Sequence, residues 1–232
     1  MIVGSGLLAQ AFAGAFAQRN DVCIYAAGVS NSACRDASEF AREQQRLSDT
    51  LQEAHLVDAF VYFGTCSVAD PDAQHTPYVQ HKLAMEQLVH AHPQGLILRL
   101  PQVAGKTSNP HTLLNFLYAR ISRSEKFDLW IRARRNIIDV ADGVLIAKQL
   151  IADRSVRNIA INVANTASYP MPDIVRAMEY VTGKKAVFDV VDCGSEYPVD
   201  TSRIIPILNN LNIGFGNDYL DKVIGKYYGV EI

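Results

Sequence analysis

The chain opens with Met1-Ile-Val-Gly4-Ser-Gly6-Leu-Leu-Ala9, an apolar run followed by a Gly-x-Gly-x-x-Ala turn and an alanine-rich helical stretch. Such a turn can hold a pyrophosphate: the first glycine allows a tight bend, the second lets backbone N–H groups approach, and the alanine lets the helix pack closely. The spacing also occurs in ordinary helix starts, so alone it is a weak indication. The candidate cofactor-binding residues in this turn are Gly4, Ser5, Gly6, Leu7 and Leu8.

Strands and helices are expected to alternate after this turn. Apolar, β-rich runs cover 21–27, 59–63 and 95–100, and helical spacing covers 37–54 and 78–91. Near-continuous apolar strands separated by single amphipathic helices are typical of a parallel sheet covered on both faces. We therefore predict an α/β fold with a doubly wound parallel sheet.

The alternation loosens after Pro101. Helices are expected at 112–121 and 143–152, and strands at 136–140 and 158–163. The last segment should hold helices at 173–182, 202–211 and 219–227 and a strand at 186–191. We predict a dinucleotide-binding domain over 1–165 and a small C-terminal α/β lobe over 166–232 that is packed on it and binds the substrate.

Composition limits the possible partners. The 232 residues carry 22 Lys and Arg against 24 Asp and Glu, a net charge of −2, without a basic run that would attract nucleic acid or an anionic membrane. No apolar run reaches the length of a membrane span. The four cysteines, Cys23, Cys34, Cys66 and Cys193, form neither a C-x-x-C pair nor a metal-binding pattern. They indicate reduced thiols in a cytoplasmic protein without a metal site.

A second candidate site combines a hydroxyl at a strand end with a helix start. Thr65 follows the third expected strand, and Tyr78-Val-Gln-His-Lys82 begins the next helix. A Tyr and a Lys four residues apart lie on one helix face, where the ammonium would lower the pKa of the phenol and make it a general acid or base. An isolated Y-x-x-x-K is usually a pair of surface residues. Here the glycine turn and Thr65 favour the catalytic interpretation.

Several motifs together resemble the extended branch of the short-chain dehydrogenase/reductase superfamily, which holds NAD-dependent epimerase/dehydratase and sugar-nucleotide reductase proteins. They are Gly4-Ser-Gly-Leu-Leu-Ala9, Ala26-Ala-Gly28, Thr65-Cys-Ser-Val68, Tyr78-x-x-x-Lys82, Leu98-Arg-Leu-Pro-Gln-Val-Ala-Gly105 and Arg135-Asn-Ile-Ile-Asp-Val-Ala-Asp142. The resemblance covers nearly the whole chain and implies a Rossmann-like sheet.

The resemblance also implies roles for single residues. Thr65, Tyr78 and Lys82 would be the catalytic hydroxyl, the acid/base and the lysine that activates the tyrosine and binds ribose. NAD or NADP would lie against the glycine turn, Ala26, Ala27, Gly28, Lys82 and Pro101, and a sugar nucleotide against Ser67, Arg135 and Asn136. Helices at 39–54 and 78–91 match those that pair across a dimer axis in the family, so we expect a homodimer.

The chain departs from the family pattern between its first two motifs. Only 16 residues separate Ala9 from Ala26, where relatives fit a second strand, a helix and a third strand. Ser30 and Asn31 stand about where NAD enzymes carry the acidic residue that binds the ribose. We favour a deletion of the strands on the adenosine side, which puts cofactor affinity in question. The alternative is that 21–28 is the ordinary second strand.

A further departure bears on the reaction. Cys66 and Ser67 replace the Asp-Glu pair with which the related 4,6-dehydratases eliminate water, so reduction or epimerisation is favoured over dehydration. The competing hypothesis is a noncatalytic module that kept the fold but lost full cofactor binding.

Smaller features have simpler interpretations. His75 and His81 are expected to be exposed, and Cys66 to be a buried, inert thiol. Asp139 and Asp142 are interpreted first as helix caps. The arginines at 132, 134 and 135 could face a phosphate but more often form a solvated rim.

Overall fold

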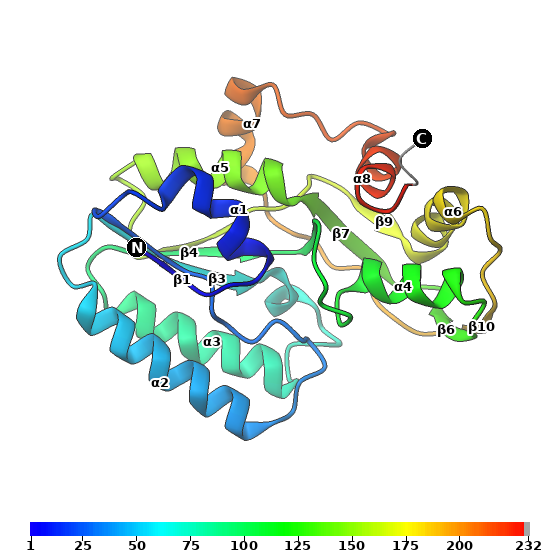
Figure 1. Ribbon diagram of the computed structural model, residues 1–232, viewed down its shortest axis with the longest axis horizontal. Coiled ribbons are helices and arrows are strands. Elements are labelled where there is room, and N and C mark those ends of the chain that lie inside the picture. Colours follow the sequence, from blue (N-terminus) through cyan, green and yellow to red (C-terminus); the bar gives the residue numbers. More distant parts are fainter. Residues whose placement is uncertain (230–232) are drawn as a thin grey trace.

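The computed structural model describes residues 1–229 of the chain. Within them, a central sheet of five parallel strands holds β1 (Ile2–Val3), β2 (Val22–Tyr25), β3 (Ala59–Thr65), β4 (Gly95–Leu100) and β8 (Ile159–Asn162), in the order β1-β2-β3-β4-β8. Helices cover both of its faces (Figure 1). The predicted parallel α/β sheet is confirmed, and each expected strand of this sheet is present.

The first hydrophobic core has two layers, one on each face of the sheet, because strand side chains alternate between the faces with a two-residue period. Ile24, Val61 and Leu98 pack under α1 (Leu7–Phe16) and α5 (Val140–Ala152). Tyr25, Phe60 and Ile97 pack on the opposite face under α2 (Ala37–Glu53) and α3 (Pro77–His90). Figure 1 shows these two helix layers above and below the sheet.

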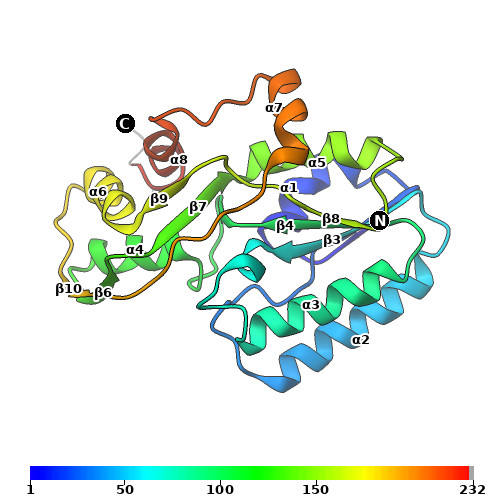
Figure 2. The same cartoon turned by 180° about the vertical axis from the view of Figure 1, so that it is seen from behind.

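The connection through α1 has the opposite hand to its neighbours. The chain steps from β1 to β2, β3 and β4 in one direction across the sheet, yet α1 lies on the face opposite to α2 and α3 (Figures 1 and 2). Two crossover connections between parallel strands have opposite handedness when they step in the same direction across the sheet but run over opposite faces. Since nearly all such crossovers are right-handed, this is an exceptional arrangement.

The strand order supports the deletion. An ordinary second strand lies on the far side of the first strand from the rest of the sheet. Here β2 lies between β1 and β3, in register with both, so β1 is an edge strand. The helix that follows the glycine turn has kept its face, whereas the strands beyond β1 are missing. The alternative, that 21–28 is the ordinary second strand, is wrong.

A second core lies beside the sheet. It is formed by α4 (Leu113–Ser122), β6 (Phe127–Trp130), α6 (Met171–Thr182) and α8 (Tyr219–Tyr228), with Ile137 of β7 (Arg134–Asp139). β7 pairs with β5 (Gln102–Ala104) and β9 (Ser168–Pro170), and β6 with β10 (Phe188–Val191). The short strands β5, β6 and β9 were not expected from the sequence.

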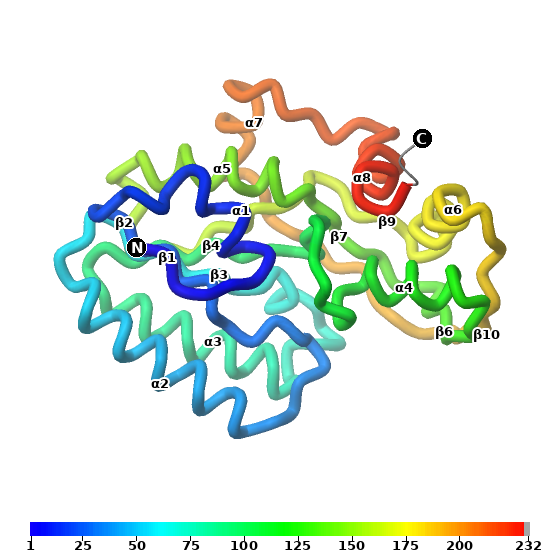
Figure 3. Tube along the Cα trace, in the orientation of Figure 1, coloured from blue at the N-terminus to red at the C-terminus, as the bar shows by residue number. Residues whose placement is uncertain are grey.

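The two cores do not divide the chain at residue 165. Residues 113–130 precede that position and pack in the second core. Ile204 and Leu208, of η2 (Ser202–Ile204) and α7 (Ile205–Leu211), follow it and pack in the first core against α5. The tube in Figure 3 shows the late segment crossing over α5 before it reaches α8. The chain therefore passes between the two cores more than once.

Asp139 joins the second core to α5. Its Oδ1 accepts a hydrogen bond from the Ala141 N–H at 2.8 Å, which confirms the expected helix cap. The same carboxylate accepts hydrogen bonds from Lys226 Nζ at 2.6 Å and from the Tyr227 hydroxyl at 2.7 Å. Asp142, also expected to cap, instead accepts from the Tyr219 hydroxyl at 2.7 Å. Both carboxylates thus fasten α8 to the helix start.

Among residues 1–229, no helix is both long enough and apolar enough to cross a membrane. The same residues contain no group of three His, Cys, Asp or Glu side chains that could hold a metal ion.

Candidate active site

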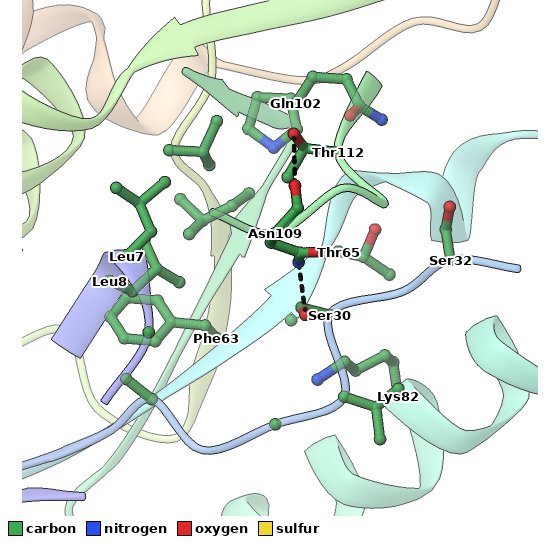
Figure 4. Close-up of a pocket in the computed structure, with 18 of the residues that line it drawn as sticks. Leu7, Leu8, Ser30, Ser32, Phe63, Thr65, Lys82, Gln102, Asn109 and Thr112 are labelled. Carbon is green, nitrogen blue, oxygen red and sulfur yellow. Dashed lines mark hydrogen bonds between the residues drawn. The ribbon is translucent and has the colours of Figure 1, made fainter. Parts of the chain in front are cut away.

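A cavity of about 440 Å³ lies at the carboxyl ends of the parallel strands. Gly4, Ala26 and Pro101 directly follow β1, β2 and β4, and Thr65 is the last residue of β3. In open α/β sheets this edge is where ligands bind. The structure brings together every residue proposed for catalysis, cofactor or substrate, because all of them line this cavity. Figure 4 shows part of its wall.

The two glycines of the turn have different surroundings. Gly4 has φ +123°, and a Cβ there would lie 2.4 Å from the carbonyl oxygen of Ala26. Gly6 is the N-cap of α1, and the position of its Cβ faces open space. The first N–H groups of α1 therefore meet the cavity without a capping side chain from Gly6. This geometry fits a phosphate group, which binds to free N–H groups at a helix start.

Thr65, Tyr78 and Lys82 converge as their spacing predicts. Thr65 Oγ1 accepts a hydrogen bond from the Ser67 N–H at 3.1 Å, which orients the hydroxyl at the strand end. Tyr78 lies in the first turn of α3, and Lys82 lies one turn later with Nζ 5.9 Å from the centre of the Tyr78 ring. All three side chains are buried.

The expected lowering of the Tyr78 pKa is wrong for this structure. Burial raises the pKa of Tyr78 to about 12, the negative charge of Glu43 adds to this, and a hydrogen bond with Thr65 partly opposes it. The Lys82 ammonium does not compensate because it points to Glu43 and Tyr62. Tyr78 therefore keeps its proton at neutral pH.

Glu43, behind the cavity wall, is one of the residues that the sequence did not indicate. Its buried carboxylate, on α2, accepts hydrogen bonds from Val29 N at 2.6 Å, Tyr62 OH at 2.8 Å and Lys82 Nζ at 3.2 Å. His81 Nε2 lies 2.9 Å from Oε2, the oxygen that also accepts the Val29 N–H. Burial alone would raise the pKa of Glu43, but the hydrogen bond with His81 and the charge of Lys82 lower it to about 2. The only sequence signal is a charged residue on the apolar face of a helix.

The remaining small predictions have mixed outcomes. His75 is exposed, as expected, whereas His81 is buried against Glu43 and stacks on Phe40 with ring centres 4.5 Å apart. The expectation of an exposed His81 is therefore wrong, because the polar loop ends before this helix turn. Cys66 is a buried thiol that donates to the Arg99 carbonyl at 3.4 Å, and burial raises its pKa to about 12. The expected burial of Cys66 is confirmed, and the raised pKa disfavours the reactive thiolate.

The proposed substrate residues differ in how freely they face the cavity. Asn136 is buried, and its amide binds the backbone of residues 165 and 167, so its polar atoms are already satisfied. Arg135 and Ser67 line the cavity beside Tyr197, which the sequence did not indicate. Arg132 is exposed and pairs with Asp192, so it belongs to the solvated rim. Arg134 is half-buried, pairs with Glu196 and donates to the Ser168 carbonyl.

Loops close the cavity on the side of β1. Asn109 Nδ2 donates to Ser30 Oγ at 3.1 Å and joins two segments that lie 79 residues apart in the chain (Figure 4). Thr112 Oγ1 donates to the Asn109 carbonyl at 3.5 Å. These loops occupy the side where the missing strands would extend the sheet. The site thus fits a dinucleotide at its phosphates, whereas its adenosine side is built from loops.

The fold is shared with solved epimerases. UDP-N-acetylglucosamine 4-epimerase from Bacillus cereus is 16% identical and has a TM-score of 0.71, with 100% of this chain and 96% of that chain covered. UDP-glucuronic acid 4-epimerase from Bacillus cereus, in complex with UDP-glucuronic acid and NAD, is 18% identical with a TM-score of 0.70, over 88% and 73%. Epimerase Mth375 from Methanothermobacter thermautotrophicus is 16% identical with a TM-score of 0.72, over 97% and 78%.

A search among curated proteins gave no match. The model of the NAD dependent epimerase/dehydratase family matches residues 6–164, more than half of the chain. These residues include the end of the glycine turn and the whole Thr65, Tyr78 and Lys82 group. The chain therefore belongs to the NAD dependent epimerase/dehydratase family, a family of NAD-dependent enzymes.

Proposed function

We propose that the protein is an NAD(P)-dependent oxidoreductase or epimerase that acts on a sugar nucleotide or a related deoxysugar. The observation that carries this proposal is the shared cavity: Thr65, Tyr78 and Lys82 line the same space as the glycine turn. Support for the substrate class comes from structures of the same fold named as epimerases of UDP-glucuronic acid and UDP-N-acetylglucosamine.

Each catalytic side chain has one task. Thr65 orients the reacting oxygen of the substrate, Tyr78 gives a proton to that oxygen or takes it away, and Lys82 supplies positive charge nearby. NAD, when bound, supplies a hydride acceptor, and its reduced form a donor. Since the raised pKa keeps Tyr78 protonated, its hydroxyl is ready to donate to a carbonyl oxygen. That is the direction of proton transfer needed when a keto group is reduced.

Elimination of water fits the site poorly. The positions of the dehydratase acid pair are held by Cys66 and Ser67. Cys66 is buried with a raised pKa and is bonded to the backbone, so it offers neither an acid nor a base at neutral pH. Reduction or epimerisation is therefore the proposed reaction.

The substrate is proposed to lie toward Ser67, Arg135 and Tyr197, next to the second core. Residues 166–232 contribute Tyr197 to this side, which supports the substrate role proposed for the C-terminal lobe. A homodimer through α2 and α3 and a cytoplasmic location stay predictions. Sedimentation velocity would test the first of them.

Calorimetric titration of NAD, NADH, NADP and NADPH into the protein tests the proposal. We expect at least one of them to bind with a micromolar dissociation constant, about −8 kcal/mol. UDP-glucose, UDP-galactose, UDP-glucuronic acid and UDP-N-acetylglucosamine should then be screened for turnover, with products separated by chromatography. If none of the four dinucleotides binds at millimolar concentration, the enzyme proposal is wrong.

A noncatalytic module is the second candidate, and one observation favours it. β1 has two residues and lies at the sheet edge, so the adenosine side lacks the strands that support a dinucleotide in relatives of full length. The same titration separates the candidates, because a module without cofactor binding gives no heat with any dinucleotide.

A further inference from the structure

Two parts of the cavity wall meet at the Glu43 carboxylate. Oε2 accepts the N–H of Val29, in the loop that follows β2, at 2.6 Å. Oε1 lies 3.2 Å from Nζ of Lys82 on α3. Val29 and Lys82 both line the cavity, and Glu43 itself does not. The carboxylate therefore connects the loop and the lysine from behind the wall.

The loop is shaped to fit this ion pair. A Cβ at Gly28 would lie 2.5 Å from Lys82 Nζ and 2.8 Å from Glu43 Oε1. A side chain at position 28 would have to displace one of these two charged groups. Gly28, which the family resemblance places at the cofactor, thus also makes room for the charges beneath the loop.

Burying these two charges costs free energy, whereas burying a contact between apolar side chains does not. Glu43 and Lys82 are 2% and 3% exposed. Apolar side chains of similar volume often give equal or greater stability than a buried ion pair. Stability alone therefore does not explain this ion pair. Its position against the cavity indicates a role in the site.

Glu43 and Tyr62 favour the charged form of Lys82 against the cost of its burial. The Tyr62 hydroxyl donates to Glu43 Oε1 and accepts from Lys82 Nζ at 3.1 Å, and Nζ lies 5.1 Å from the centre of the Tyr62 ring. Burial lowers the pKa of Lys82 below its ordinary value, and the negative charge of Glu43 and the hydrogen bond to it oppose this lowering. The titratable and charged groups around the pair are Tyr25 on β2, Arg46 on α2, Tyr62 on β3, and Tyr78, His81 and Glu86 on α3.

We propose that Glu43 is a positioning residue for dinucleotide binding: it holds the charged Lys82 ammonium and the loop at 26–29 in one arrangement, so that the two walls form a single site. This inference rests on the proposed function, because it gives Lys82 a role toward the cofactor. His81 supports Glu43 by holding its second oxygen, while Lys82 touches the cavity.

Glu43→Gln provides the direct test, because glutamine keeps the size and one acceptor oxygen but removes the charge. Lys82 would remain buried without a counter-charge, so its pKa should fall and its proton should be lost as the pH rises. We expect NAD binding, measured by calorimetry, to weaken at least about 10-fold, and more at about pH 9 than at about pH 6. Wild-type binding should change much less over this range.

Two further variants separate positioning from folding. Glu43→Asp restores the charge and should recover the flat pH profile even where the shorter side chain weakens binding. Glu39→Gln lies on the same helix, where Glu39 forms an exposed ion pair with Arg42, and should bind NAD like the wild type. Thermal unfolding of each variant shows whether it is folded during the titration.

A double-mutant cycle shows whether Glu43 acts through Lys82. If it does, adding Glu43→Gln to Lys82→Met should change the NAD dissociation constant less than about 2-fold. Equal binding by Glu43→Gln and the wild type, or an equal loss in both backgrounds, would overturn the inference alone. If Glu43→Gln does not fold, a Glu43→Asp profile that stays pH-dependent would overturn it. A wild type that binds no dinucleotide would overturn the proposed function as well.

Discussion

The two halves of the cavity are supported by different kinds of structure: the inner half, at Thr65, by the central strands, and the outer half, at Gly4, by loops. Thr65 ends a strand whose seven residues are all buried and which is flanked by a strand on each side. Gly4 follows a strand of two residues at the sheet edge, and loops joined by the bond between Asn109 and Ser30 complete that half. The deletion thus shortened the sheet from one side. The side chains proposed for proton transfer are still supported by the hydrophobic core. The half of the cavity that would hold the dinucleotide is now formed by loops.

The largest expected effect tests the inner half. Tyr78→Phe removes the hydroxyl that is proposed to move a proton and keeps the ring that packs in the wall. We expect turnover of the sugar nucleotide to fall by about 10²- to 10⁴-fold, with the dissociation constant of NAD nearly unchanged. Steady-state kinetics and calorimetry measure the two quantities.

Tyr180→Phe is the matched control, because Tyr180 is 87% exposed on α6. It should leave both quantities as they are. If Tyr78→Phe keeps the wild-type turnover, Tyr78 is not the acid/base and the inner half does not have the catalytic role proposed for it.

The glycine turn gives the next largest effect, on folding. Gly4→Ala places a Cβ at φ +123°, 2.4 Å from a backbone oxygen that cannot easily move. We expect the free energy of unfolding to fall by about 2 to 4 kcal/mol, measured with urea. Gly14→Ala, inside α1 with open space around its Cβ, should raise it by about 0.5 to 1 kcal/mol. If both substitutions behave alike, the outer half is not held by its turn.

The elements that follow from the sequence are those in which local pattern and burial agree. The strand 95–100 and the helix 37–54 were found almost to the residue, because apolar runs and amphipathic spacing persist over several turns or alternations. β5 and β9, with three residues each, leave no such pattern and form only by pairing with β7. Their existence depends on tertiary contacts that no local window contains.

The candidate site divides in the same way. Thr65, Tyr78 and Lys82 could be predicted because their spacing on a strand end and a helix face is local. Glu43 and Tyr197 could not, since they reach the site from positions 39 residues before Lys82 and far into the C-terminal part of the chain. The pKa of Tyr78 was predicted in the wrong direction for the same reason, because the partner that takes up the Lys82 charge is distant in sequence.

Acid pH offers a test of the inner half through stability. The pKa of Glu43 lies at about 2 in the folded protein, below its ordinary value, so the carboxylate contributes stability above that ordinary value and loses it as the pH falls toward 2. The wild type should exceed Glu43→Gln in unfolding free energy by about 2 kcal/mol at neutral pH, and the difference should shrink below about pH 4. Urea unfolding at several pH values measures it. A difference that stays constant with pH would show that Glu43 does not carry this linkage.

The smallest expected effect concerns the outer half and its choice between NAD and NADP. Among the cavity-lining residues in the described part of the chain there is no Asp or Glu, and Ser30, Ser32 and Arg46 stand on the side of the loops. A carboxylate that binds the ribose hydroxyl also repels the 2′-phosphate of NADP. The absence of such a carboxylate should therefore weaken the discrimination between NAD and NADP. We expect the two dissociation constants to differ by less than about 10-fold. Arg46→Ala should weaken NADP by about 3-fold and leave NAD unchanged, because an exposed arginine adds only a modest attraction. Strong preference for NAD in the wild type would mean that the loops rebuild the selectivity that the missing strand once supplied.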